Sequence, residues 1–499
     1  MFGAVTRRAR RGSPRIAVIG AGISGILVGI KLLEKGLRDF TIFEKGDDIG
    51  GTWRDNVYPG VACDVPSHLY VYSFEPNPDW THRFAAGADI HRYYRKTAEK
   101  YGVVPHVRLR TEIAAADWQG DHWLLRTTEG ETVAADILIS AVGRLHHPSI
   151  PEIEGLDSFA GATFHSSRWR RDIDPAGKRV GVIGTGSSAT QITATLSRTA
   201  QRLSLFQRTP QWVLAIPNDP LPRWMAPIHR YVPFASRLYY RRVAAQLAER
   251  TSVLNKGDRT DYDRAARASL DLIRDPELKA RLTPDYAPGC KRMVRSPDFH
   301  EAIQRPNVEL VSDPIDHVEP RGIVTRDGRL HELDVLVLAT GFKVDAFMRP
   351  MTMTGEGGVS LETVWEDGPL NYRSVAIPQM PNFFLINGPY SPGGSASIVS
   401  IAEIDTAYIM QCIDKIVREK VAIAPRLDRS RELLENVRER ASKTVWVTGG
   451  CNSWYLGKDG VPIVNPATLA ELAEELRIPD FADFEVVAAT GQAPDRLAA

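Results

Sequence analysis

The pattern of apolar and polar residues repeats itself at two places along the chain. Near the start, the apolar run Ile16–Ile19 leads into the glycine cluster Gly20–Gly25 and then into the apolar-rich stretch Ile26–Leu33. A short apolar run followed by glycines and a longer periodic stretch is typical of a buried strand, a tight turn and a helix. The same order recurs at Val180–Ile183 and Gly184–Ala189. The pattern therefore predicts two strand–turn–helix units of the kind that begins a Rossmann fold.

Each glycine cluster is followed at the same distance by a charged residue, and the two charges have opposite sign. Glu44 lies 24 residues after Gly20, and Arg208 lies 24 residues after Gly184. In a dinucleotide-binding unit the glycines let the backbone approach a pyrophosphate, and the charged residue meets the ribose. A carboxylate accepts a hydrogen bond from a free 2′-hydroxyl, whereas an arginine suits a 2′-phosphate. Either cluster alone could mark a plain turn, but the matched pair predicts FAD at the first unit and NADP(H) at the second.

The repeat extends to two buried-strand patterns that end in small residues, Asp136–Gly143 and Asp334–Gly341, which we interpret as the closing strands of the two units. We expect an α/β protein with two dinucleotide-binding, Rossmann-like domains, the NADP domain being inserted in a discontinuous FAD domain. The expected boundaries are 1–144 for the first part of the FAD domain, 145–335 for the NADP domain, and 336–499 for the second part with a C-terminal segment. Within the NADP domain, residues 221–282 predict a helical insertion that serves either as a lid or as a packing accessory. A further helix is expected from about Ile401 to Val417.

The composition excludes several other classes of protein. With 43% hydrophobic and 25% charged residues, the chain of 499 residues is typical of a globular protein of two or three domains. Its net charge of +1 creates no general attraction to nucleic acid. The four cysteines, Cys63, Cys290, Cys412 and Cys451, are far apart in sequence, which argues against a zinc ribbon and against the C-x-x-C pair of disulfide reductases. No cluster has the spacing of metal ligands, so no metal is expected.

The N-terminus and the hydropathy bear on location. The basic residues Arg7, Arg8, Arg10 and Arg11 precede a strand pattern and not the apolar core of a signal peptide. No apolar stretch approaches the roughly 18 residues that cross a bilayer. We therefore expect a cytoplasmic protein without an integral membrane segment.

Five motifs carry a resemblance to a known family. They are Gly50-Gly51-Thr52-Trp53 continuing to Tyr58-Pro59-Gly60 and Asp64, the linker from Phe159 to Trp169 with the pattern F-x-G-x-x-x-H-x-x-x-W, Cys290-Lys291-Arg292, Ala339 to Phe342, and Cys451 to Tyr455. Along nearly its whole length the chain resembles the Baeyer–Villiger monooxygenases, within the wider group of flavin-containing monooxygenases. Trp169 is typical of the ketone-oxidising branch, whereas Arg170 departs from the proline or aspartate that the family has there.

The resemblance implies an NADPH- and oxygen-dependent flavoprotein that inserts one oxygen atom into a ketone through a flavin peroxide, giving an ester or lactone. Such chemistry needs a cation beside the anionic oxygen and a site that excludes water. The resemblance places Arg292 there, and a guanidinium stays charged at any working pH. Asp64 would hold this arginine in position, and His165 in the linker would keep the two domains in register.

The expected cofactor contacts follow from the fingerprints and from the resemblance. They comprise Gly20, Gly22, Gly25, Glu44, Gly51, Thr52, Trp53, Asp64 and Tyr70 for FAD, and Gly184, Gly186, Ser187, Ser188, Arg208, Thr209 and Lys291 for NADP. The substrate pocket is expected between the insertion at 221–282, the loop at 345–353 and the segment at 389–397.

Three other functions remain open on the sequence. A flavin monooxygenase that oxidises sulfides or amines would share these motifs but would depend less on Arg292. An NADPH-dependent flavin oxidase or reductase would use the same cofactors and release hydrogen peroxide. A redox-sensing flavoprotein would need none of the catalytic motifs.

Overall fold

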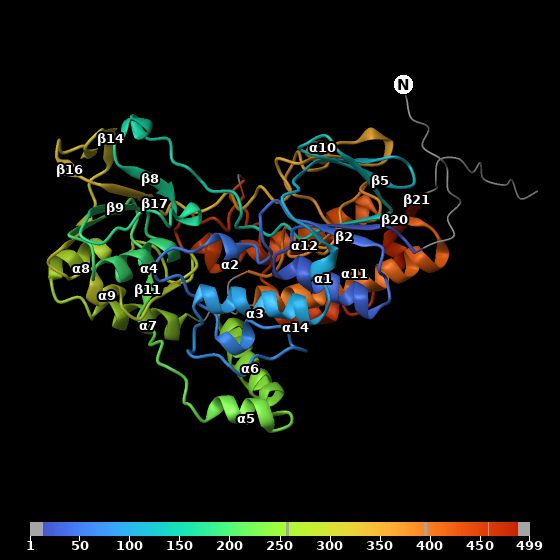
Figure 1. Cartoon of the computed structure of the whole chain (residues 1–499), viewed down its shortest axis with the longest axis horizontal. Helices are drawn as coiled ribbons and strands as arrows, with labels where there is room; N and C mark the ends of the chain where they lie inside the picture. Colours follow the sequence, from blue (N-terminus) through green and yellow to red (C-terminus); the bar gives the residue numbers. More distant parts are fainter. Residues whose placement is uncertain (1–12, 256–258, 394–396, 458, 488–499) are drawn as a thin grey trace, which may run out of the picture.

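The computed structural model describes residues 13–255, 259–393, 397–457 and 459–487 of the chain. Two units lie side by side along the long axis, one built mainly from residues 150 to 340 and the other from the two ends of the chain (Figure 1). The predicted fold class, with two Rossmann-type units, is confirmed. The basic residues near the N-terminus and the last residues of the chain, after Val487, lie outside the described residues.

The first unit is built on a parallel sheet with the strand order β19-β7-β1-β2-β3. Its strands are β1 (Ile16–Ile19), β2 (Phe40–Phe43), β3 (Val107–Arg108), β7 (Ile137–Ser140) and β19 (Phe383–Leu385). Helix α1 (Ile23–Glu34) connects β1 to β2 and buries its apolar face against the sheet and against α11 (Ile398–Glu419). The strand that the sequence predicted as closing this unit, β7, lies directly beside β1.

The second unit repeats this arrangement with the strand order β13-β10-β9-β17-β8. Its strands are β8 (Ala162–His165), β9 (Arg179–Ile183), β10 (Arg202–Phe206), β13 (Val308–Val311) and β17 (Val335–Leu338), and α4 (Ser187–Leu196) follows β9. Because β17 pairs with β9 in parallel, the boundary expected at 335/336 falls inside this strand. The chain returns to the first unit only after Leu338.

Each unit also carries a small antiparallel sheet before its closing strand. In the first unit this sheet is formed by β4 (Ile113–Trp118), β5 (Trp123–Thr127) and β6 (Thr132–Ala135), with β18 (Thr352–Thr354) added parallel to β4. In the second unit it is formed by β14 (Ile315–Glu319), β15 (Gly322–Thr325) and β16 (Leu330–Glu332). The doubling that the fingerprints indicate thus extends to the parallel sheet and the small antiparallel sheet of each unit.

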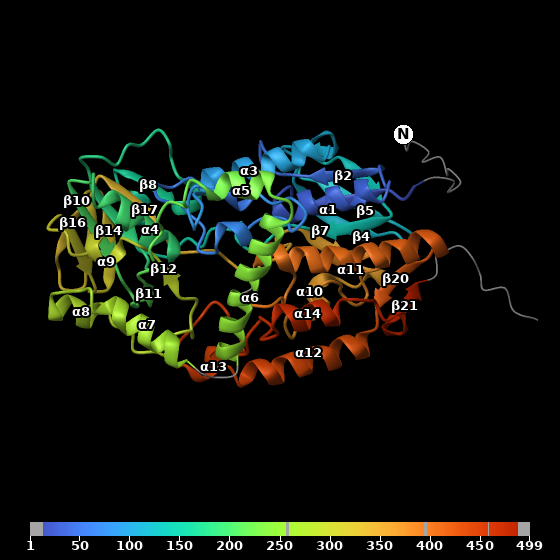
Figure 2. The same ribbon diagram turned by 90° about the horizontal axis from the view of Figure 1, so that it is seen from below.

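The segment at 221–282 is helical, as predicted. It contains α5 (Met225–Tyr231), α6 (Ala235–Asn255), α7 (Thr260–Leu270) and α8 (Pro276–Leu282). Helices α7 and α8 pack on the second unit, where Leu270 and Leu282 join its core. Helix α6 runs to the first unit (Figure 2) and meets α11, where the hydroxyl groups of Tyr240 and Ser400 are 3.2 Å apart. The insertion therefore spans both units.

The remaining elements complete the two units and the connections between them; α9, β11 and β12 belong to the second unit. They are α2 (Thr52–Asp55), α3 (Gly87–Lys100), α9 (Phe299–Ala302), α10 (Leu361–Val364), α12 (Leu427–Ser442), α13 (Val445–Thr448), α14 (Leu469–Glu475), β11 (Val213–Leu214), β12 (Val294–Arg295), β20 (Ala422–Pro425) and β21 (Phe484–Val487). The expected helix at 401–417 is found as α11. Among the described residues there is no helix whose length and hydropathy would let it cross a bilayer.

Candidate active site

One large cavity, of about 830 Å³, opens where the two units meet. Gly20 and Gly22 of the first fingerprint line it, and so do Gly186, Ser187 and Ser188 of the second. Two segments that are more than 150 residues apart in sequence thus face the same space. This juxtaposition lets two dinucleotides approach each other, which electron transfer between them requires.

The first glycine of each fingerprint has a conformation and an environment that only glycine tolerates. Gly20 has φ of +99°, and a Cβ atom there would lie 2.7 Å from the carbonyl oxygen of Ala141, just after β7. Gly184 has φ of +123°, and a Cβ atom would lie 2.4 Å from the carbonyl oxygen of Ala339, just after β17. Each glycine therefore lets the turn press against the closing strand of its own unit.

The helices that follow the fingerprints begin without a side-chain cap. Gly22 is the N-cap residue of α1 and Gly186 that of α4, and neither offers a side chain to the free N–H groups of the first turn. A Cβ atom on Gly186 would meet nothing within 4 Å, so there is open space over the second fingerprint. At the first fingerprint a Cβ atom on Gly22 would lie 3.6 Å from the Cα atom of Gly51, and Gly22 lines the cavity. Both helices thus present uncapped N–H groups of the kind that binds a pyrophosphate.

Glu44, at the end of β2, is buried and held in a fixed orientation. Its carboxylate accepts hydrogen bonds from the N–H groups of Ala21, at 2.9 Å, and Gly46, at 2.7 Å. Arg54 lies 2.8 Å from the same carboxylate and balances its charge. Glu44 also lines the cavity next to the fingerprint, so its expected contact with a ribose stays a prediction with a suitable geometry.

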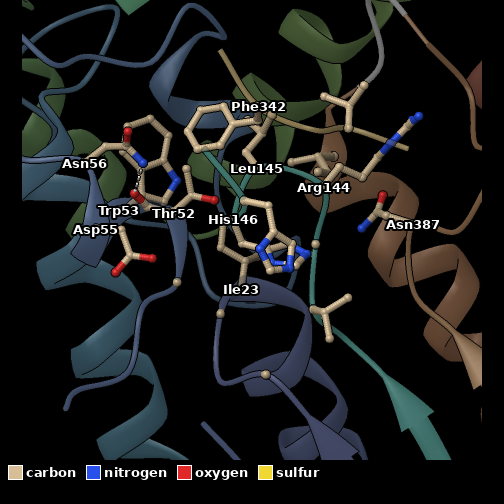
Figure 3. A pocket seen from close by; sticks show the side chains of 18 of the residues that line it. Ile23, Thr52, Trp53, Asp55, Asn56, Arg144, Leu145, His146, Phe342 and Asn387 are labelled. Atoms are coloured by element: carbon tan, nitrogen blue, oxygen red, sulfur yellow. Dashed lines mark hydrogen bonds between the residues drawn. The ribbon is translucent and has the colours of Figure 1, made fainter. Parts of the chain in front are cut away.

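The motif around Thr52 and Trp53 forms one wall of the cavity (Figure 3). The indole N–H of Trp53 donates to the hydroxyl of Tyr70 at 3.3 Å, and the two rings meet edge to face. Both side chains are more than nine-tenths buried. This rigid aromatic wall excludes water and suits the flat face of a flavin.

Arg292 and Asp64 form a bidentate ion pair that faces the cavity. The Nε atom of Arg292 donates to one carboxylate oxygen at 3.1 Å and Nη2 donates to the other at 2.6 Å. The side chains keep 36% and 19% of their accessible surface, so the pair is open to a ligand. Burial by itself raises the pKa of Asp64, but the charge and hydrogen bonds of Arg292 outweigh it and the pKa lies below its ordinary value. Asp64 in turn raises the pKa of Arg292, so both groups are charged at neutral pH.

Sequence reasoning missed two neighbours of this pair. Arg295 donates from Nη1 to the backbone oxygen of Asp64 at 2.6 Å. Tyr455 is buried beside the pair: burial raises the pKa of its phenol, although the charge and hydrogen bond of Arg292 oppose that shift. Tyr455 belongs to one of the motifs, and only the fold shows that this motif reaches Arg292.

The expected NADP phosphate site lies outside the cavity lining formed by the described residues. Arg208 is exposed at the end of β10, and the hydroxyl of Thr185 donates to the backbone oxygen of Thr209 at 2.9 Å. Burial lowers the pKa of Lys291, and the charge of Arg208 lowers it further. The structure therefore brings these two cations together from positions 83 residues apart.

The comparison with protein families agrees with this geometry. Residues 13–351 match the model of the flavin-binding monooxygenase-like family. The chain belongs to this family. A monooxygenase of Mycobacterium tuberculosis is 47% identical over 91% of the chain and 92% of its own length. A Baeyer–Villiger monooxygenase of Streptomyces coelicolor is 36% identical over 95% of the chain and 92% of its own length.

Solved structures extend the similarity to the fold. A steroid monooxygenase bound to NADP superimposes with a TM-score of 0.85 and 30% identity, covering 96% of this chain and 100% of the other. Cyclohexanone monooxygenase from Rhodococcus bound to NADP⁺ gives a TM-score of 0.84 and 28% identity, covering 95% and 99% of the two chains. The resemblance that the motifs indicated is confirmed.

In this monooxygenase the linker histidine lies at the end of β8 and contacts the segment by which the chain returns to the first unit. His165 is buried, and its Nε2 atom lies 2.9 Å from the backbone oxygen of Gly341, where the chain returns to the first unit. Its Nδ1 atom contacts the hydroxyl of Ser167 at 2.9 Å. The expected role in keeping the units in register stays a prediction, which these contacts favour. Arg170, the departure from the family motif, is exposed and pairs with Asp172.

A second bridge between the units was not foreseen. The hydroxyl of Tyr58, in the first unit, donates to the side-chain oxygen of Gln191 at 2.9 Å and accepts from the hydroxyl of Ser188 at 3.1 Å. The disulfide between Cys290 and Cys451 likewise joins the Lys291–Arg292 segment to the segment of Tyr455. A separation of 161 residues gave no signal of this pairing in the sequence.

The expected walls of the substrate pocket are only partly correct. Met348, Arg349, Pro350 and Met351 of the loop at 345–353 line the cavity, as do Ser391, Pro392 and Gly393 of the segment at 389–397. No described residue of the insertion at 221–282 lines it, because α6 passes over the surface between the units and α7 and α8 pack on the second sheet. The expectation that the insertion forms a pocket wall was therefore wrong for the part of it that the structure describes.

Proposed function

We propose that this chain is an NADPH- and FAD-dependent Baeyer–Villiger monooxygenase that converts ketones to esters or lactones. The observation that carries the proposal is the Arg292–Asp64 ion pair on a cavity shared by both dinucleotide fingerprints. When bound, FAD supplies the redox chemistry, since it accepts electrons from NADPH and activates molecular oxygen. FAD would lie over the first fingerprint against Thr52 and Trp53, and NADP would lie over the second with its 2′-phosphate at Arg208 and Lys291.

The residues of the chain position the reactants, supply a fixed charge and exclude water. Arg292 provides a fixed positive charge next to the oxygen on which negative charge develops. Asp64 keeps the guanidinium in one orientation, so no reorganisation is needed during the reaction. Trp53 and Tyr70 exclude water, which would otherwise divert activated oxygen to hydrogen peroxide.

A fixed cation favours ketones over sulfides or amines. Attack on a carbonyl carbon uses the oxygen as a nucleophile and leaves negative charge on the carbonyl oxygen, which Arg292 stabilises. Oxidation of a sulfide uses an electrophilic oxygen and gains little from a neighbouring cation. The substrates and the cytoplasmic location both stay predictions.

A single-turnover experiment tests the proposal. The FAD-loaded protein is reduced without oxygen by one equivalent of NADPH, then mixed with oxygen, and the flavin spectrum is followed with and without a ketone such as cyclohexanone. We expect a delayed return to the oxidised spectrum, a faster return when ketone is present, and one equivalent of ester. An immediate return with one equivalent of hydrogen peroxide, unchanged by ketone, would indicate an oxidase. Acceleration by a sulfide but by no ketone would favour the heteroatom-oxidising alternative.

A further inference from the structure

Arg144 is one of several cations that line the cavity, and neither the ion pair nor the expected cofactor contacts use it. It follows strand β7 and Gly143, and it lines the cavity with Leu145 and His146 (Figure 3). Its Nε and Nη2 atoms are buried without a hydrogen-bond partner in the described parts of the chain. A buried, unsatisfied donor is destabilising, so a protein that keeps two of them on a charged group usually has a ligand for them.

The two unpartnered atoms form the edge of the guanidinium that binds carboxylates side-on. Arg292 uses the same Nε–Nη2 edge for Asp64, at 3.1 and 2.6 Å. Arg349, also at the cavity, uses it for Glu362, at 2.7 and 2.8 Å. In this chain the edge is thus repeatedly matched to a planar carboxylate, whereas in Arg144 it has no such partner among the residues that the structure describes.

The surroundings of Arg144 do not neutralise it. Its guanidinium lies over the rings of Phe347 and Trp454, at 5.3 and 5.8 Å from the ring centres. Asp345 acts on it only through its charge, without a hydrogen bond. Burial lowers the pKa of Arg144 to about 10, which leaves the group charged at neutral pH.

The expected cofactor phosphates are assigned to other places. The pyrophosphates belong at the uncapped starts of α1 and α4, and the 2′-phosphate belongs at Arg208 and Lys291. Arg144, by contrast, lies over the ring of Trp454, whose centre is 4.2 Å from that of Tyr455, and Tyr455 is hydrogen bonded to Arg292. A ligand with a carbonyl at Arg292 could therefore reach Arg144 with a second, anionic group.

We infer that Arg144 binds a carboxylate of the substrate, and that the preferred substrates are ketones that carry a carboxylate on an apolar chain. This inference rests on the proposed function, since it names the substrate class of the same cavity. Trp454 and Leu145, which both line the cavity, provide the apolar surface for the chain between the two functional groups. The carboxylate oxygens of the substrate accept hydrogen bonds from the guanidinium. This contact fixes the orientation in which the ketone enters the cavity.

The test compares levulinate and its longer homologues, which are methyl ketones with a terminal carboxylate, with their methyl esters. The values of kcat/KM for product formation are measured with the FAD-loaded wild type and with Arg144→Gln and Arg144→Lys. We expect the wild type to prefer the acids. Arg144→Gln should lower kcat/KM for the acids by about 10- to 100-fold, because a charge-assisted bidentate contact is lost. It should change kcat/KM for the esters by less than about threefold. Arg144→Lys keeps the charge but not the planar edge, so its kcat/KM for the acids should lie between those of the wild type and Arg144→Gln.

Arg349→Gln is the matched control, because its guanidinium also lies at the cavity but is already bound by Glu362. It should leave the acid-to-ester ratio unchanged. A wild type without preference for the acids would overturn the inference. An equal loss of kcat/KM for acids and esters in Arg144→Gln would also overturn it, because Arg144 would then act on flavin binding or on the stability of the fold.

A binding measurement separates this inference from the proposed function. The oxo acids are added to the oxidised, FAD-loaded protein without NADPH, and the thermal unfolding temperature is recorded. A rise in the wild type that is absent in Arg144→Gln supports the carboxylate site even if no ketone is oxygenated. If the unfolding temperature of the wild type does not rise, the carboxylate site is refuted. Oxygenation of neutral ketones would in that case still support the proposed function.

Discussion

Replacing Arg292 tests the central element of the proposed mechanism, and two substitutions separate its charge from its geometry. Arg292→Lys keeps a positive charge but has one nitrogen in place of the two that contact Asp64 at 3.1 and 2.6 Å. Arg292→Ala removes the charge as well. Neither change touches the fingerprints, so both variants should bind FAD and NADPH.

The magnitude follows from the geometry of the pair. Charges about 4 Å apart attract each other by about 4 kcal/mol at an effective dielectric constant of about 20. Arg292 keeps 36% and Asp64 keeps 19% of the side-chain surface, and water screening reduces this figure to about 2 kcal/mol. Loss of that anchoring in Arg292→Lys should lower the turnover of ketone by about 10- to 30-fold. In Arg292→Ala ester formation should vanish while NADPH is still oxidised.

The assay measures ester, NADPH consumption and hydrogen peroxide in the same sample. Wild type should form one ester for each NADPH consumed, whereas Arg292→Ala should use the electrons of NADPH to reduce oxygen to hydrogen peroxide. Arg295→Gln is a suitable control. Arg295 donates to the backbone oxygen of Asp64, so its replacement leaves the bidentate contact between Asp64 and Arg292 in place. The rate of ester formation should fall by less than about threefold. Ester formation at the normal rate by Arg292→Ala would refute the reasoning.

Three further predictions concern cofactor choice, the junction of the units and pH. Changing Arg208 or Lys291 to Gln should raise the KM for NADPH by about 10- to 100-fold and that for NADH by less than about threefold, because only NADPH has the 2′-phosphate; equal effects would contradict the assignment. Tyr58→Phe removes both hydrogen bonds to α4 and should lower the free energy of unfolding by about 1–2 kcal/mol, whereas an unchanged denaturation midpoint would show that the bridge adds nothing. Burial raises the pKa of Asp405 to about 8. Because this folded-state pKa lies above the unfolded one, stability is greatest below about pH 4 as far as this group is concerned and falls as the pH rises toward about 8. Asp405→Asn should remove that dependence and be more stable than wild type at pH 8 by about 5 kcal/mol, measured by urea unfolding at pH 5 and pH 8; a variant less stable at pH 8 would disprove it.

Local patterns along the chain determine much of the fold. The strand–glycine–helix order near Gly20 and Gly184 requires a turn that bends sharply and packs closely, and the structure shows both turns pressed against their closing strands. The helices at 221–282 and α11 were also predicted, because apolar periodicity is a local property of the chain. The contact between Arg292 and Asp64 was correctly predicted, although from family resemblance and not from spacing.

The tertiary structure decided the contacts between residues that are far apart in sequence. The boundary after β17 depends on which sheet that strand joins, and hydropathy does not distinguish two sheets of the same kind. The path of the insertion away from the cavity depends on packing partners in both units.

The same holds for Arg144, which in the sequence is one arginine among many. Only the fold gathers Phe347 and Trp454 around it and leaves two of its nitrogens without partners among the described residues, which is the basis of the role that we infer for it. The sequence by itself therefore determined which cofactors and which reaction class to expect, since these depend on short motifs with fixed local geometry. The cavity that selects a substrate was decided by tertiary structure, because its walls come from segments that meet only when the chain is folded.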